Sequence, residues 1–578
     1  MVALGNALLS PFEILGSLER ATRRYRAELT GMAAQDPRRP AARKALAQVL
    51  FERHQSTQDE TAYLEAAGIA RELAAEDALD ARLIARWGHA VAGRIQQTAL
   101  GMTPGAGEPH AGGIAALTAN EVVSTLLAED APGALEGLEE GRALLLSGAF
   151  NTRGELDALR AADPGLAAEF TALREEALAA LNPGQEASPG EQDRFRERMA
   201  RCAELVERIK ALPGFARFLL PLPLGIAELR PAAAEGPVVA INVHASRCDA
   251  LALCADGVVP IPLPGLSAAD LVAQAGAFET AVGTLTSCPG GFLAEQAQHT
   301  VRDTLAWLWE VLAEPVLTRL GFTVTPAEGR DWPRLWWSPT GPLNFLPLHA
   351  AGKGAGESVL DRVVSSYTPT LRALLRARSR PAPARRTALA VAMPQTPGQT
   401  PLPATVREAT ALAGRFAGPA PLIGAEATAA AVRAALPGVT IAHFACHASS
   451  DPEDVSAARL LLHDGPLDVT EISELDLGSA ELAYLSACAT ARGSLRHANE
   501  AVHLASACQL AGYPQVVATL WEVEDEVAAT VAAEFHRAVA AQRGRLDGAT
   551  ALHTAVRRVR AAAPERPGSW AAYLHAGA

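Results

Sequence analysis

The 578-residue sequence has few cysteines, no basic leader and no long apolar run, and each shortage excludes a class of protein. Its seven cysteines are odd in number and include no CxxC pair, which argues against a disulfide framework or a structural zinc site. The apolar N-terminus lacks a basic segment, and no uninterrupted apolar stretch reaches the roughly 18 residues of a membrane span. We therefore expect a cytoplasmic protein that does not bind membranes.

Charge of one sign is not concentrated anywhere in the chain. Lys+Arg 51 against Asp+Glu 64 gives a net charge of −13, spread without long runs, so we expect no direct binding of nucleic acid. The sequence also lacks HExxH, GxSxG and paired-carboxylate patterns, and the glycines of AAGKGAGES lack the spacing of a phosphate-binding loop. Hydrophobic residues are abundant, at 49%, which is typical of a globular chain with large cores.

The periodicity of apolar residues divides the chain near residue 236. Before it, apolar residues recur at helical spacing, with turns marked by Pro and Gly, so residues 1–235 are predicted to be all-α, in the manner of a degenerate helical array. From residue 236 a β-branched, alternating segment predicts a hairpin, followed by helices at 268–285 and 299–321. The Pro-rich segment 378–386 indicates a further boundary.

The last third of the sequence alternates between strand and helix patterns. The predicted strands are 387–393, 440–446, 480–488 and 515–521, and the predicted helices are 404–416, 427–436, 500–512 and 524–541. This order predicts a parallel sheet with helices on both faces. In such sheets, ligands bind at the carboxyl ends of the strands.

Two reactive residues follow neighbouring strands of this predicted sheet. His447 ends one strand and Cys488 ends the next, so their side chains are expected at one edge, where imidazole could take the thiol proton. The backbone N–H groups of Ala448 and Cys488 could then stabilise an oxyanion. The alternative is that Cys488 is a buried small hydrophobe.

The other histidine and cysteine positions are predicted to be structural. His443, Cys446 and His447 could suggest metal, but residues 443 and 446 of a strand face opposite sides and no closing ligand pair is apparent. We therefore expect no metal and place His443 in the core. Four cysteines in apolar runs are also expected in the core: Cys248, Cys254, Cys446 and Cys508.

Several motifs resemble the CHAT domain, a family of caspase-like and separase-like cysteine peptidases. They are LWWSPTGPLNFLPLHAAG, HFACHASSD, LAYLSACATARG and NEAVHLASACQLAGYPQVVATLWEVED. The resemblance implies a TPR-like helical region at 1–235, a non-catalytic caspase-like half at 236–385 and a catalytic half at 386–578. It implies that His447 is the general base and Cys488 the nucleophile. Ala448 stands where caspase-like enzymes usually have Gly, and it still offers its N–H.

The resemblance also implies an activity and its partners. It implies a cysteine endopeptidase without metal or organic cofactor, which cleaves a specific protein partner in bacterial defence, such as a gasdermin-like protein. A regulatory protein would bind the helical region. The alternatives are an inactive interaction scaffold with the same fold, or a Cys–His acyltransferase or amidase that acts on small molecules.

Asp525 has two interpretations. The segment LWEVED is similar to separase, in which an Asp at this position meets a substrate arginine, so the resemblance implies an anionic pocket for the residue before the scissile bond. Alternatively, Asp525 caps the helix that begins there, since acids favour the first turn of a helix.

Overall fold

A computed structural model describes residues 224–578 except 245, 289, 328, 450–458, 476 and 487–503. Before residue 224 it describes shorter stretches, chiefly 22–33, 130–141, 162–179 and 204–215. The described residues of this N-terminal part include α7 (Ala131–Gly141) and α9 (Pro164–Ala179), as expected for a helical region. The predicted pairing of helices into TPR-like repeats lies largely outside the described residues.

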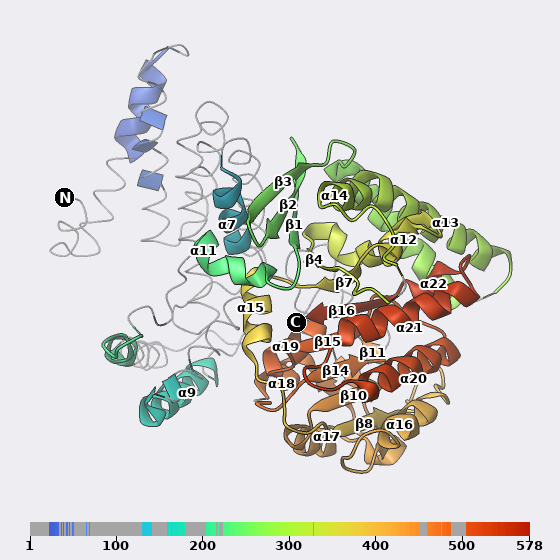
Figure 1. Ribbon diagram of the computed structural model, residues 1–578. Helices are drawn as coiled ribbons and strands as arrows, with labels where there is room; N and C mark the ends of the chain where they lie inside the picture. The colour runs from blue at the N-terminus through green and yellow to red at the C-terminus, as the bar shows by residue number, and fades with distance from the viewer. Residues whose placement is uncertain are drawn as a thin grey trace.

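The centre of the molecule is one eleven-stranded sheet (Figure 1). Its spatial order is β3-β2-β1-β4-β7-β16-β15-β14-β10-β8-β9. The bounds in that order are Gly257–Pro262, Cys248–Cys254, Val238–Val243, Arg334–Ser338, Val364–Tyr367, Tyr573–Gly577, Gln515–Thr519, Leu482–Leu485, Ile441–Ala445, Ala388–Ala392 and Leu422–Ile423. Pairing is parallel except at β1–β2, β2–β3 and β15–β16, so the sheet is mixed rather than purely parallel.

Alternating side chains show that both faces of the sheet are covered. In β4, Leu335 and Trp337 join the core formed with α12 (Ala268–Ser287) and α13 (Phe292–Leu308), whereas Trp336 joins a second core. That second core contains α7, α11 (Ile226–Leu229) and α15 (Leu371–Ser379). Since successive residues of a strand point to opposite faces, the two cores lie on opposite sides of the sheet.

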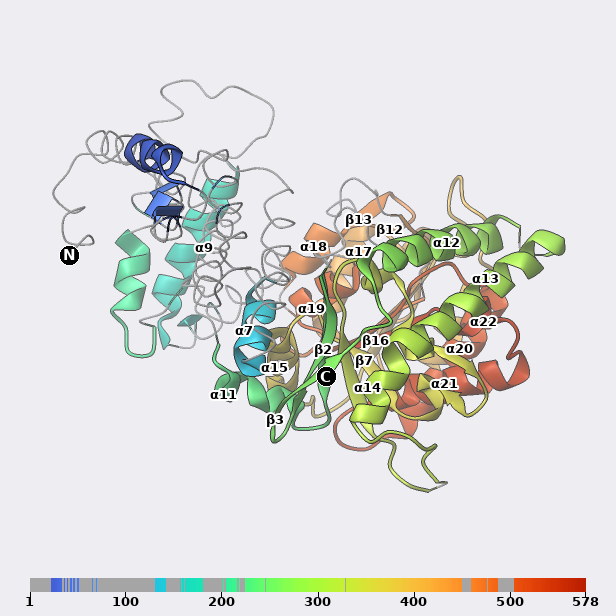
Figure 2. The same cartoon turned by 90° about the horizontal axis from the view of Figure 1, so that it is seen from above.

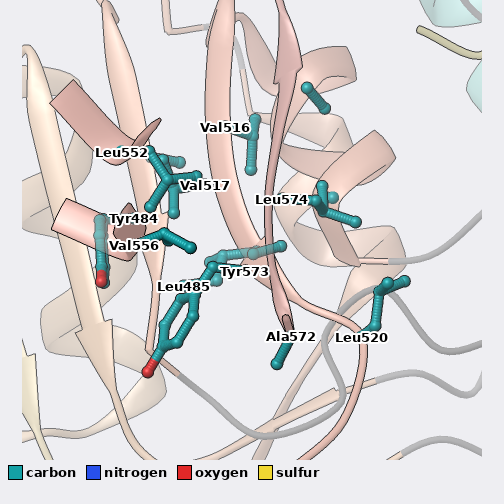
Figure 3. Close-up of a cluster of buried hydrophobic side chains, with 14 of the residues drawn as sticks. Tyr484, Leu485, Val516, Val517, Leu520, Leu552, Val556, Ala572, Tyr573 and Leu574 are labelled. Atoms are coloured by element: carbon teal, nitrogen blue, oxygen red, sulfur yellow. The ribbon is translucent and has the colours of Figure 1, made fainter. Parts of the chain in front are cut away.

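The predicted elements of the last third are confirmed to within a few residues. Strands β8, β10, β14 and β15 correspond to the four expected strands, and they pair in parallel with one another. The four expected helices are α16 (Thr405–Ala413), α17 (Ala429–Ala435), α19 (Leu504–Ala511) and α20 (Asp525–Ala541). Figure 3 shows the core where β14, β15 and β16 meet α21 (Gly548–Ala562), with the Tyr484, Val517 and Leu552 side chains among those drawn.

The last strand joins the two expected halves into one sheet. β16 pairs with β15 on one side and with β7 on the other, so strands from before and after residue 385 belong to one continuous sheet. Helix α7, from the expected helical region, also packs on this sheet, against β1 and β3, and lies beside them in Figures 1 and 2. In the part of the chain that the structure describes, no helix is long and apolar enough to cross a membrane.

Three buried histidines make the fold sensitive to acid. Burial lowers the pKa of His349 to about 4 and the pKa values of His553 and His575 to about 3, from an ordinary 6.5. In the unfolded chain these histidines are protonated near pH 6.5, whereas in the folded chain they are protonated only at the lower pH values given above. Their contribution to stability is present above pH 6.5 and is lost as the pH falls toward 4.

We predict that the free energy of unfolding falls between pH 7 and pH 5, by up to about 1.4 kcal/mol per pH unit for each such histidine. Urea unfolding at several pH values measures this slope. His349→Gln should flatten the slope, whereas His299→Gln, at an exposed histidine, should leave it unchanged. Equal stability at pH 7 and pH 5 would contradict the prediction.

Candidate active site

Strands β10 and β14, which precede His447 and Cys488 in the sequence, lie side by side in the sheet. They pair in parallel from Ile441↔Leu482 to Phe444↔Leu485, a constant offset of 41 positions. The pairing extends one residue further, because Ser486 N–H donates to the Phe444 carbonyl at 2.9 Å. His447 and Cys488 are separated by the same 41 positions. Cys488 itself lies outside the described residues, so the structure does not test its contact with His447.

His447 lies just after β10 and is 5% exposed. Its Nε2 is 2.7 Å from the carbonyl oxygen of Thr400. A carbonyl only accepts hydrogen bonds, so Nε2 must carry the proton, and in the neutral ring Nδ1 then holds the free lone pair. Nδ1 is therefore the atom of His447 that can take a proton from a nucleophile.

The Thr400 carbonyl belongs to the connection between β8 and α16, residues 393–404, and hydrogen bonds fix this connection at both ends. At the β8 end, the Met393 N–H donates to the Ala445 carbonyl of β10 at 2.9 Å. At the α16 end, the Leu402 N–H donates to the Pro394 carbonyl at 3.0 Å, and Thr405 Oγ1 donates to the Leu402 carbonyl at 2.7 Å. This connection thus presents a carbonyl to His447 from a backbone held by two neighbouring elements.

Of the two residues of the predicted oxyanion site, Ala448 is described, and it begins β11 (Ala448–Ser449). This strand pairs antiparallel with β12 (Arg459–Leu461), with Ala448 opposite Leu460. The Leu461 N–H donates to the His447 carbonyl at 2.9 Å, so positions 447 and 461 are a hydrogen-bonded pair. In an antiparallel ladder the next pair is not hydrogen-bonded, and the Ala448 N–H therefore points away from β12.

Asp525 is the first residue of α20, but its carboxylate serves a different helix. Its Oδ2 accepts a hydrogen bond from the N–H of Ala404, the residue before α16, at 2.8 Å. Burial raises the pKa of Asp525, and the Ala404 N–H opposes that rise. The N-cap residue of α20 is Glu524, so in place of the predicted capping of α20, Asp525 binds the N-cap residue of α16. That residue, Ala404, lies four positions after Thr400 in the sequence.

The burial predicted for the other histidine and cysteine side chains is largely confirmed. His443 is fully buried, as are Cys446 and Cys508, and Cys248 is 5% exposed, whereas Cys254 is only half-buried. Burial raises the pKa of Cys508 to about 12, which makes it a poor nucleophile. Among the residues that the structure describes, no three His, Cys, Asp or Glu side chains form a group that could hold a metal ion.

Comparison with known proteins identifies the C-terminal part of the chain. Residues 302–578 match the model of the CHAT domain, so this part is a CHAT domain. The match leaves out β1, β2 and β3, which belong to the same sheet. Comparison with curated proteins gave no match.

Solved structures with similar regions include two structures of the gingipain RgpB and one of a separase. The complex of the pro- and mature domains of RgpB from Porphyromonas gingivalis is 11% identical, with a TM-score of 0.33, over 46% of this chain and 69% of that one. The Arg-specific cysteine proteinase gingipain R is 10% identical, with a TM-score of 0.34, over 46% and 68%. Separase in the Saccharomyces cerevisiae separase–securin complex is 9% identical, with a TM-score of 0.42, over 98% of this chain and 52% of that one.

Proposed function

We propose that this chain, whose residues 302–578 are a CHAT domain, is a cysteine endopeptidase that uses Cys488 and His447 to cleave a specific protein partner. The observation that carries the proposal is the hydrogen bond from His447 Nε2 to the Thr400 carbonyl, which leaves Nδ1 as a base. The parallel register of β10 and β14 supports the pairing of His447 with Cys488, because the two residues follow adjacent strands at the same offset.

The proposed reaction proceeds through a thioester. His447 Nδ1 takes the thiol proton of Cys488, and the thiolate attacks the scissile carbonyl carbon. The N–H groups of Ala448 and Cys488 donate to the resulting oxyanion, while the Thr400 carbonyl stabilises the imidazolium. The imidazolium protonates the leaving amine as the C–N bond breaks, and water then hydrolyses the thioester with His447 again as base.

Cys488→Ala and His447→Ala should each lower peptide cleavage by at least about a thousandfold, because each removes a group that reacts directly. Cleavage of a peptide library, with thermal unfolding of each variant, measures this. Cys446→Ala is the matched control, since this cysteine lies beside His447 in sequence and is fully buried. Loss of cleavage in Cys446→Ala but not in Cys488→Ala would contradict the assignment.

We further propose that Asp525 binds an arginine side chain before the scissile bond. The proposal rests on position and charge: Asp525 contacts the connection that carries Thr400, and only its Oδ2 has a hydrogen bond recorded among the described residues. Its Oδ1 can therefore accept from a guanidinium N–H, and such a charge-assisted bond adds direction as well as energy.

Asp525→Asn should lower kcat/KM for a peptide with Arg before the scissile bond by about 10- to 100-fold, and little for the matched Leu peptide. Asn keeps an acceptor for the Ala404 N–H, so thermal stability should hardly change. Glu526→Gln, at the neighbouring exposed acid, is the control. An Arg preference that survives Asp525→Asn would remove Asp525 from the pocket.

We also propose that the helical region binds a regulator and acts on the CHAT domain through α7. The Glu139 carboxylate of α7 accepts from the Leu371 N–H at 2.8 Å and the Arg372 N–H at 3.0 Å, at the start of α15. Leu135 and Leu138 of α7 lie in the core around Trp336.

By analogy with other CHAT-domain proteins, the proposed substrate is a bacterial defence protein, such as a gasdermin-like pore former.

Deletion of residues 1–129, which retains α7, should change the rate or selectivity of cleavage while preserving thermal stability. A deletion to residue 218 removes α7, uncovers the core around Trp336, and should also lower the melting temperature. Cleavage assays and thermal unfolding of both deletions against the full chain measure this. Unchanged rate and selectivity in the shorter deletion would contradict the regulatory proposal.

A further inference from the structure

A second cluster of ionisable side chains lies under the candidate active site, and the proposed reaction does not use it. It consists of Glu408 on α16, His443 on β10 and His536 on α20, which are 4%, 0% and 2% exposed. His443 Nδ1 is 2.9 Å from His536 Nε2, and His443 Nε2 is 3.0 Å from Glu408 Oε2. The ring of Tyr484 from β14 stacks on His443 at 4.9 Å between centroids.

Burial of these polar side chains between α16, β10 and α20 carries a desolvation penalty. Glu408 Oε2 and His443 Nε2 are in contact without an aligned hydrogen bond, so neither polar atom fully recovers its lost hydration. Burial also lowers the pKa of His536 well below its ordinary value. Apolar side chains of similar size would join the same elements at lower cost, so stability alone does not explain these residues.

The position of the cluster points to a different role. Glu408 lies four residues after Ala404, which ends the connection that carries the Thr400 carbonyl. His443 lies four residues before His447 on the same strand and its extension. The contact between Glu408 and His443 therefore joins the two elements whose separation sets the 2.7 Å hydrogen bond between His447 and Thr400.

Helix α20 supports this arrangement from a third side. His536 of α20 contacts His443, and Asp525 at the start of the same helix accepts from the Ala404 N–H. The α16 helix is thus tied to β10 through Glu408 and to α20 at its first turn. A shift of α16 along β10 would break these contacts together.

We infer that Glu408 and His443 are positioning residues for His447. Through their contact they hold the Thr400 carbonyl where it fixes the proton on Nε2, and so keep Nδ1 free as the base. The inference rests on the proposed peptidase function for its kinetic consequence, but the state of the His447 ring can be observed without any cleavage.

The test compares Glu408→Met and Glu408→Gln with the full-length wild type. Glu481 supplies the matched control, because it is another buried acid of the same half. Its carboxylate is paired with Arg386 at 2.7 and 3.0 Å, just before the amino end of β14 and away from His447. Nitrogen NMR of histidine-labelled protein reports which ring nitrogen carries the proton, and His447→Gln assigns the His447 signal.

In wild type and in Glu408→Gln, the neutral His447 ring should be protonated at Nε2. In Glu408→Met it should be a mixture of the two tautomers, and kcat should fall about tenfold or more while KM changes less than about twofold. Glu481→Met should lower the melting temperature but change neither the His447 signal nor kcat.

A wild-type His447 signal and kcat in Glu408→Met would overturn the inference, as would the same losses in Glu481→Met. If Glu408→Met does not fold, His443→Gln breaks the contact from the other side and carries the same expectation. Absence of cleavage in the wild type would contradict the proposed function, and the NMR comparison would still decide the role of Glu408.

Discussion

The parallel pairing of β10 with β14 is the constraint on which the candidate site depends. Parallel strands place their carboxyl ends at one edge, and the register that begins at Ile441↔Leu482 sets which residues follow each strand together. The neighbouring elements build on this edge. The connection from β8 supplies the Thr400 carbonyl, and the start of α20 supplies Asp525, which holds the last residue of that connection. A backbone carbonyl thus fixes which ring nitrogen of His447 carries the proton.

The two edges of the sheet carry different chemistry. Just before the amino end of β14, the buried Glu481 carboxylate is paired with Arg386, which binds it through two nitrogens and binds the Gly544 carbonyl through one of them. Under the carboxyl ends, Glu408 and His443 are in contact without an aligned hydrogen bond. The two buried acids therefore differ in how completely their hydrogen-bonding capacity is satisfied.

The sequence predicted the local elements of the CHAT domain and the pairing of the successive strands β10 and β14, but not the contacts between more distant segments. Periodicity and turn residues located β10, β14 and α20, because these signals depend on neighbours a few residues apart. Nothing local indicated that β16 would lie between β7 and β15, or that α7 would share a core with Trp336, since pairing between distant segments leaves no periodic signal. The partner of His447 was also missed, because a backbone carbonyl has no residue type to recognise.

Activation of Cys488 by His447 is tested most directly by covalent labelling of the full-length chain with an irreversible peptide probe for cysteine nucleophiles. Mass spectrometry of the digested protein identifies the labelled residue. We expect rapid labelling of Cys488 that is slowed strongly by His447→Ala and is absent in Cys488→Ala. Labelling of the exposed Cys288 instead, or labelling of Cys488 at the same rate with and without His447, would contradict it.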